Sequence, residues 1–288
     1  QMRTPPPLSP AYLPAPVKRV NNPDRERWEL MMSRARQFLT AGELRKIVLA
    51  RRCVFDFGEP LHPMALLLRL HEASPDSFHF CFNHGNEIAF IGATPERLYQ
   101  RIERSIQSEA LAGTRPRGAT DEDDRWLESD LLASGKERDE HDMVVQAIRK
   151  TLTPFCQSLT HHEKPDVLKL RYVQHLRTLI HGHLKEGVTD ADLLLALHPT
   201  PAVGGVPKEN AVRHIVDLEP FDRGWYTAPI GWAMEDQVEF AVAIRCALIE
   251  GSTLSLYSGA GIMPQSDTEQ EWREIESKIS NFVRILTT

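Results

Sequence analysis

The chain has 288 residues, of which 41% are apolar, and this is enough to bury one large core or two fused smaller ones. Its formal net charge of −6 argues against a nucleic-acid surface, because phosphate binding normally needs a basic stripe. A small anionic substrate is still compatible with this charge, since a pocket needs only a few local cations or a metal.

No stretch approaches about 18 uninterrupted apolar residues, so the sequence predicts no contact with a membrane. The four cysteines lie far apart without CxxC spacing, which indicates reduced thiols and neither a zinc site nor a redox pair. We therefore expect a cytoplasmic protein.

The beginning of the chain is rich in proline, which removes backbone donors and favours an extended conformation over helix or core strand. The predicted organisation is a linker or extended segment over residues 1–18 and a single domain over residues 19–288. Apolar residues then recur at helical spacing between residues 22 and 44, after the capping-type segment NPDRE, and predict an amphipathic helix.

The segment KIVLARRCVF alternates in a way that predicts a strand with two chemically different faces. Residues 63–72 indicate a second helix, and SFHFCFNHGNEIAFIG indicates two strands around an Asn-His-Gly-Asn turn. Helical periodicity with charges on the opposite side continues over residues 121–162.

Near the middle of the chain, the pattern of KLRYVQHLRTLIHGHL does not decide between a strand that runs into irregular chain and a short helix. VEFAVAIRCALIEGSTLSLYSG predicts a hairpin, and EQEWREIESKISNFVRIL predicts a closing helix. Because helices and strands come in mixed runs without strict alternation, we predict an α+β fold with antiparallel sheet.

The closing helix places Glu271, Glu274 and Lys278 on one face, and an earlier helix does the same with Glu137 and Glu140. Carboxylate oxygens are hard ligands, so two such pairs facing each other could hold Mg²⁺. Taken alone, glutamates at this spacing are more typical of a solvated helix face.

Two further residues are candidates for proton transfer. Lys46 lies within an apolar strand, where burial would favour a neutral amine that can act as a base. Glu96 follows an apolar run and could be kept protonated by similar burial, which would make it an acid. An edge-strand lysine and a surface glutamate are the plainer interpretations.

Several segments, read in chain order over about residues 22–288, resemble the motif series of chorismate-utilising enzymes. They are KIVLAR, GATPERL, EALAGTRPRG, SGKERDEH, VQHL, HPTPAVGG, DRGWY, FAVAIRCA, YSGAGI and EWREIESK. The resemblance implies two large packed antiparallel β-sheets with helices outside and an active site in the cleft between them. Members of the family usually carry a further N-terminal stretch, so part of the N-terminal fold is expected to be missing or shortened.

The resemblance also implies roles for individual residues. Lys46 matches the lysine that activates the attacking water, and Glu96 matches the acid that protonates the departing 4-hydroxyl. Glu140 and Glu274 match direct Mg²⁺ ligands, with Glu137 and Glu271 acting beside them through water. The implied substrate pocket comprises Gly113, Thr114, His175, Ala202, Tyr226, Arg245, Gly259, Gly261 and Lys278, of which Arg245, Tyr226 and Lys278 receive carboxylates. His198 is expected either to shape the HPTP turn or to contact the ligand.

Within the family, two departures guide the choice of reaction. The segment DMVVQAIRKTL lacks the DLxRND-type pattern of amine-forming members, which counts against a glutaminase partner. Ala202 stands where salicylate synthases tend to have threonine, and alanine is typical of isochorismate synthases.

We therefore expect an isochorismate synthase, an isomerase that acts on chorismate with Mg²⁺ and as a monomer. The alternatives are a salicylate synthase, which also eliminates pyruvate, and a non-catalytic chorismate-binding or assembly domain. The use of the product in menaquinone, siderophore or salicylate biosynthesis stays open.

Overall fold

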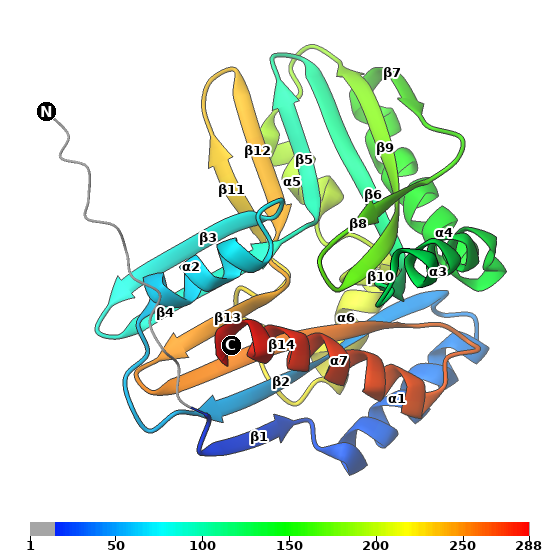
Figure 1. Cartoon of the computed structure of the whole chain (residues 1–288). Coiled ribbons are helices and arrows are strands. Elements are labelled where there is room, and N and C mark those ends of the chain that lie inside the picture. Colours follow the sequence, from blue (N-terminus) through cyan, green and yellow to red (C-terminus); the bar gives the residue numbers. More distant parts are fainter. Residues whose placement is uncertain (1–14, 288) are drawn as a thin grey trace, which may run out of the picture.

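The computed structural model describes residues 15–287, which form two seven-stranded antiparallel sheets with helices on their outer faces (Figure 1). The first sheet has the order β1 (Lys18–Asn22), β2 (Lys46–Asp56), β14 (Thr253–Ile262), β13 (Cys246–Glu250), β4 (Ile88–Thr94), β3 (Phe78–Gly85), with β10 (Gly205–Val206) paired to β2. The second has the order β11 (Pro229–Ala233), β12 (Gln237–Val242), β5 (Arg97–Ile102), β6 (Ser105–Pro116), β9 (Val173–Leu184), β7 (Cys156–His161), with β8 (Asp166–Lys169) paired to β9. The expected α+β class with two antiparallel sheets is confirmed.

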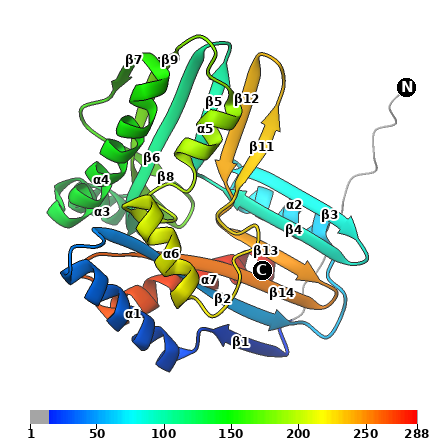
Figure 2. The ribbon, with the colours of Figure 1, turned by 180° about the vertical axis from the view of Figure 1, so that it is seen from behind.

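Each sheet has its own apolar core. The first core combines β2 and β14 with α1 (Arg25–Thr40), α2 (Pro63–Ala73), α6 (Lys208–Leu218) and α7 (Thr268–Thr287). The second combines β6, β9 and β12 with α4 (Gly135–Leu152) and α5 (Asp190–Leu197), and α3 (Asp121–Ala133) precedes α4. From behind, α4 and α5 are seen on the second sheet, and α1 and α6 beside the first (Figure 2).

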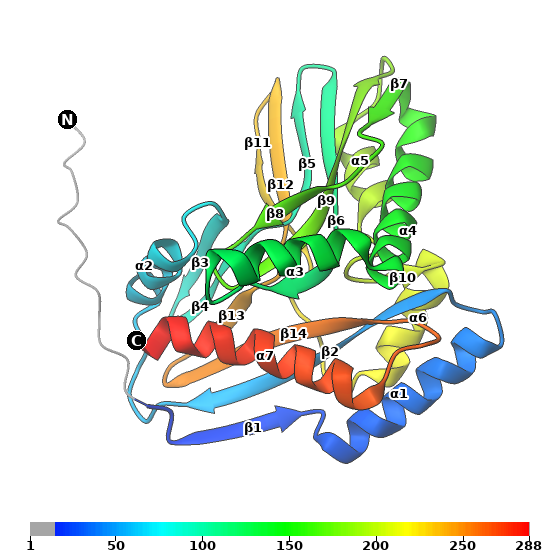
Figure 3. The same cartoon turned by 45° about the vertical axis from the view of Figure 1, so that its right-hand side comes forward.

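The two acidic helices come from different halves of this arrangement. Turned by 45°, the structure shows α7 running along β14 of the first sheet, with α3 and the start of α4 above it (Figure 3). Ser134 caps α4 by accepting a hydrogen bond from the Glu137 amide, which fixes where the first acidic turn begins.

The chain crosses between the sheets twice at the same place. One crossing joins β4 to β5 through residues 95–96, and the other joins β12 to β13 through residues 243–245. The two crossings are tied together, because the Val242 amide donates to the Glu96 carbonyl at 2.9 Å and the Ala93 amide donates to the Arg245 carbonyl at 3.1 Å. Two residues with predicted roles, Glu96 and Arg245, therefore lie where the sheets meet.

Most predicted elements are present, but two are wrong in part and one undecided segment is now assigned. The helical run expected to reach residue 162 ends at Leu152, and β7 begins at Cys156 after a short 3₁₀ turn (Thr153–Phe155). The undecided segment is the long strand β9. The hairpin expected over residues 238–259 is wrong in its first strand, because β12 belongs to the second sheet and only β13 and β14 form the hairpin.

The two unlike faces expected for β2 are present, with Ile47 and Leu49 in the first core and Lys46 and Val48 lining a pocket. Residues 46–51 are buried on both faces. At the N-terminus, β1 begins at Lys18, just inside the expected linker, and residues 1–14 lie outside the described part of the chain. None of the helices between residues 15 and 287 has the length and apolar character needed to span a bilayer.

Candidate active site

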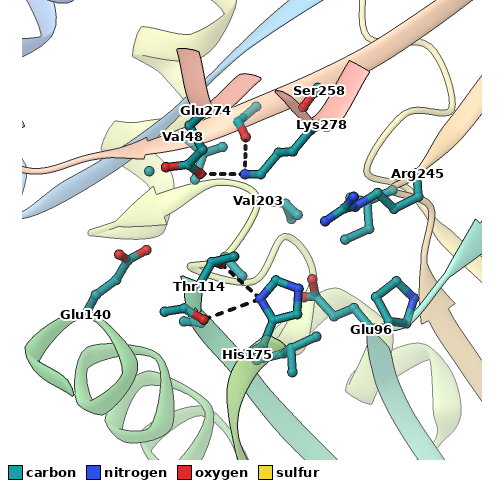
Figure 4. A pocket seen from close by; sticks show the side chains of 18 of the residues that line it. Val48, Glu96, Thr114, Glu140, His175, Val203, Arg245, Ser258, Glu274 and Lys278 are labelled. Carbon is teal, nitrogen blue, oxygen red and sulfur yellow. Dashed lines mark hydrogen bonds and ion pairs between the residues drawn. The ribbon is translucent and has the colours of Figure 1, made fainter. Parts of the chain in front are cut away.

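A pocket lies at the junction of the two sheets, and every residue with a predicted site role except His198 lines it (Figure 4). The first sheet and its helices contribute residues of β2, β14 and α7, and the second sheet and its helices contribute residues of β6, β9 and α4. Figure 4 shows Glu140 and Glu274 on different helices facing the same space, with His175 and Arg245 further along. The lining also includes Val48, Pro95, Leu111, Ala112, Lys136, Val203, Ile244, Tyr257 and Ser258, which the sequence reasoning did not single out.

Lys46 is almost fully buried, with 1% of its surface exposed, and its Nζ donates to Glu140 Oε1 at 2.8 Å. The sequence reasoning placed this amine among apolar groups, and the structure instead pairs it with a carboxylate. Gly261 makes room for the pair, because a Cβ there would lie 2.8 Å from Lys46 Cε and 3.0 Å from Glu140 Oε1. A side chain at position 261 would therefore push the lysine and the glutamate out of place.

Glu96 is buried without a cationic partner in contact. Burial and the nearby charge of Glu109 raise the pKa of Glu96 to about 7, while Thr200 and Lys46 act in the opposite direction. The only side-chain hydrogen bond recorded to its carboxyl among residues 15–287 comes from the Thr200 hydroxyl at 3.4 Å. A carboxyl with this pKa is protonated in an appreciable fraction near neutral pH, as a general acid requires.

Four glutamates from α4 and α7 line one side of the pocket. Glu137 accepts hydrogen bonds from the Thr114 amide at 3.1 Å and from Arg115 Nη1 at 2.9 Å. Glu274 accepts from Lys278 Nζ at 2.6 Å. Although burial opposes the effect, Lys278 keeps the pKa of Glu274 below its usual range. Burial and the charge of Glu274 raise the pKa of Glu271 to about 7.

These carboxylates suit a hard divalent cation in their chemistry, but they do not form a ready-made cage. Between residues 15 and 287, no three His, Cys, Asp or Glu side chains are grouped closely enough to hold a metal ion as they stand. Negative charge is crowded here, because Glu274 and Glu140 add to the effect of burial in raising the pKa of Glu271. A divalent cation would relieve that crowding, and small side-chain rotations away from Lys46 and Lys278 would free the oxygens.

Arg245 and Lys278 are two of the basic groups that line the pocket, and Arg245 is available for an anionic ligand. Arg245 forms no ion pair with a carboxylate of residues 15–287, and burial lowers the pKa of its guanidinium. Its backbone has φ of 52°, a left-handed conformation that aims the side chain at the sheet junction. Lys278 Nζ also donates to the Gly259 carbonyl at 3.0 Å, which holds it at the pocket edge.

His175 is held as a neutral ring. Burial and the charges of Arg245 and Lys278 lower the pKa of His175 to about 3. Its Nδ1 lies 2.9 Å from Thr114 Oγ1 and 3.3 Å from the Gly113 carbonyl oxygen. Because a carbonyl can only accept, the proton is placed on Nδ1, which leaves Nε2 as an acceptor.

Gly113 has φ of 79° and lies at a bulge, where the pairing of β6 and β9 shifts. The bulge turns the Thr114 side chain towards His175.

The HPTPAVGG loop forms the remaining wall. Ala202 and Val203 line the pocket, whereas His198 does not. His198 Nε2 lies 2.8 Å from the Thr227 carbonyl oxygen, so of the two roles expected for it, shaping the turn fits the structure. Thr200 and Glu109, which influence Glu96, were missed by sequence reasoning because neither sits at a spacing that marks a site.

Comparisons with known proteins place this site in context. A family model described as "Chorismate binding enzyme" matches residues 5–287. Isochorismate synthase MenF of Bacillus subtilis (strain 168) is 39% identical over 264 residues, which are 91% of this chain and 56% of that protein. The chloroplastic isochorismate synthase of Catharanthus roseus is 37% identical over 273 residues, which are 94% of this chain and 47% of that protein.

Among solved structures, MenF, the menaquinone-specific isochorismate synthase from Escherichia coli, matches with a TM-score of 0.93 at 36% identity. The match covers 98% of this chain and 65% of that one. This chain thus spans about half the length of the two curated relatives, 56% and 47%.

Proposed function

Because this chain belongs to the family of chorismate-binding enzymes, we propose that it is an isochorismate synthase. The reaction adds water at C2 of chorismate and expels the 4-hydroxyl as the ring double bonds shift, so the net change is an isomerisation. The observation that carries the proposal is that Lys46 and Glu96 line one pocket together with cations for carboxylates. Relatives bearing the name isochorismate synthase support this choice within the family.

Substrate binding would use two basic groups of the pocket, Arg245 and Lys278, the second of which would exchange Glu274 for a substrate carboxylate. Chorismate carries two carboxylates, and Arg245 and Lys278 lie on the pocket wall where they would receive them. The hydroxyl of Tyr226 lies close to Gly259, since a Cβ at position 259 would come within 3.0 Å of it. The bare glycines at 259 and 261 would let the substrate approach the backbone.

Proton transfer would use groups from both sheets. Lys46 Nζ, which lies 2.8 Å from Glu140 Oε1, would accept a proton from the attacking water once that carboxylate has turned towards the metal ion. Glu96 would donate its proton to the departing 4-hydroxyl, which leaves as water. Each positioned group would contribute roughly 10²- to 10⁴-fold in rate. Exchange of protons with solvent would then return both groups to their starting forms.

The four helix glutamates would hold Mg²⁺, with Glu140 and Glu274 as direct ligands and Glu137 and Glu271 acting through water. When bound, the ion would supply positive charge beside the ring carboxylate and fix the orientation of the substrate. Without such a cation, crowded carboxylates would repel a dianionic substrate.

The choice of isochorismate as the final product depends on Ala202, which places only a methyl group at the pocket wall. Incubation with chorismate and Mg²⁺, followed by chromatography of the products, tests the proposal. We expect isochorismate with little pyruvate, and no conversion after addition of EDTA. Stoichiometric release of pyruvate would point to a salicylate synthase, and binding without turnover would point to a non-catalytic domain.

A further inference from the structure

A buried ion pair lies directly behind the pocket wall without lining the pocket. Glu219 follows the last residue of α6, and its carboxylate receives two hydrogen bonds from Arg223, at 2.8 Å from Nε and 2.5 Å from Nη2. The Glu219 side chain is only 2% exposed. A bidentate pair of this kind is rigid, because a planar guanidinium matches a carboxylate in one geometry.

The same pair also holds two walls of the pocket. Arg223 Nη2 donates to the Val48 carbonyl at 2.9 Å, and Nη1 donates to the Val203 carbonyl at 2.8 Å. Glu219 Oε1 accepts from the Ala50 amide at 2.8 Å. Val48 lies two residues after Lys46, and Val203 directly follows Ala202.

The pair fills a gap in the first sheet. On one side β2 pairs with β14 along its length, but on the other side β10 covers residues 46–47 and β1 covers residues 52–56. Between them, the Val48 amide donates to the Gly204 carbonyl at 2.7 Å, and the remaining groups meet Glu219 and Arg223. Side chains therefore replace a strand at the point where β2 passes the HPTPAVGG loop.

We propose that Glu219 and Arg223 are a positioning pair that sets the distance between Lys46 and the loop carrying Ala202. The pair thereby controls the rate of water addition and the loss of product to pyruvate elimination. This inference rests on the proposed function, and it acts through backbone contacts, since neither residue touches the pocket. The turn that begins at Arg223 extends the effect to Tyr226, whose amide donates to the Arg223 carbonyl at 2.9 Å.

Arg223→Lys tests the inference, because lysine keeps the charge but has three donors on one nitrogen, whereas Arg223 makes four hydrogen bonds from three nitrogens. Arg101→Lys is a matched control. Arg101 also binds a carboxylate with two hydrogen bonds, to Asp190, and donates to the carbonyls of Glu103 and Glu235, but it lies outside the pocket lining.

In Arg223→Lys we expect kcat to fall by up to about 100-fold, because small misplacements of reacting groups have large effects on rate. KM should change less, since Arg245 and Lys278 are untouched, and the ratio of pyruvate to isochorismate should rise. Hydrogen exchange should accelerate at residues 46–52 and 198–206. Arg101→Lys should show none of these changes at a comparable melting temperature.

If Arg223→Lys matches the control in kcat, product ratio and hydrogen exchange, the inference is overturned. Glu219→Gln, which keeps an acceptor for the Ala50 amide, is measured beside it and should show the same changes to a smaller degree. It decides the question if Arg223→Lys does not fold. Should the unmodified chain form no isochorismate, the proposed function fails, whereas the exchange data still decide whether the pair holds both walls.

Discussion

The ionisable pocket residues of α4 and α7 differ in their partners from those on the two segments that cross between the sheets, residues 95–96 and 243–245. On α4 and α7, Glu140 and Glu274 are each bound to a lysine, at 2.8 and 2.6 Å. On the crossings, Glu96 meets only the Thr200 hydroxyl at 3.4 Å, and Arg245 has no carboxylate partner within residues 15–287. The helix groups are compensated and partly exposed, while the crossing groups are buried and left for a ligand.

This difference shows how one pocket can both bind a metal ion and keep groups ready for a substrate. Glu274 can exchange Lys278 for a metal ion at modest cost, because both side chains remain near water. A carboxyl and a guanidinium that are buried at the sheet junction keep the protonation state that burial imposes until a substrate arrives. Four changes test whether the division holds.

Glu96→Gln should have the largest effect, because the amide keeps the shape but has no proton to give to the 4-hydroxyl. We expect kcat to fall by about 10²- to 10⁴-fold while chorismate still binds, as measured by steady-state kinetics and calorimetry. Glu239→Gln is the control, since Glu239 holds the neighbouring Arg97 at 2.9 Å without lining the pocket. Equal activity losses in both variants would remove Glu96 from the acid role.

Glu274→Gln tests the helix side and should weaken Mg²⁺ binding by about tenfold or more, because the change removes a charged oxygen donor. Titration calorimetry with Mg²⁺ measures this without reference to turnover. Glu276→Gln is the control. Glu276 lies on the same helix but pairs with Arg19 and Arg51, so the Mg²⁺ affinity of this variant should equal that of the unmodified chain. Unchanged affinity in Glu274→Gln would show that α7 holds no metal ligand at this position.

The pH dependence of kcat/KM tests the protonation of Glu96 without removing its carboxyl. With the pKa of Glu96 raised to about 7, the acid is protonated below neutral pH, so kcat/KM should fall as the pH rises through 7. Glu109→Gln removes a neighbouring negative charge, which lowers the pKa of Glu96, and the break in the profile should move to lower pH. A break that stays in place, or moves upward, would mean that Glu109 does not act on the acid.

Ala202→Thr should have the smallest effect. A hydroxyl at the pocket wall is expected to add pyruvate as a minor product while isochorismate stays the major one. Coupled detection of pyruvate measures the fraction directly. An unchanged product mixture would mean that position 202 does not govern the partition.

Much of the fold followed from local pattern, and the failures have a common cause. The helices α1, α2 and α7 were predicted because their apolar faces repeat at helical spacing. The hairpin over residues 238–259 was wrong because the chain leaves one sheet and enters the other at Ala243–Arg245, and alternation looks the same in either sheet. Long-range pairing, which local pattern does not contain, decides such cases.

The site residues, too, were only partly predictable from local pattern. Spacing alone placed Glu137 with Glu140, and Glu271 with Glu274, on helix faces, and the structure turns both faces to one pocket. Glu96 was a candidate only because it follows an apolar run, and Arg245 was found through resemblance to a family. Arg223 lay within the motif DRGWY and Glu219 just before it, but their contacts to β2 join segments far apart in the sequence, at a separation of 169 between Ala50 and Glu219.

The central claim, addition of water at C2 with departure of the 4-hydroxyl, is tested most directly by turnover in oxygen-18-labelled water. Mass spectrometry of the isochorismate should show one labelled oxygen, located on C2, in each molecule formed from chorismate and Mg²⁺. Unlabelled isochorismate would contradict the roles of Lys46 and Glu96.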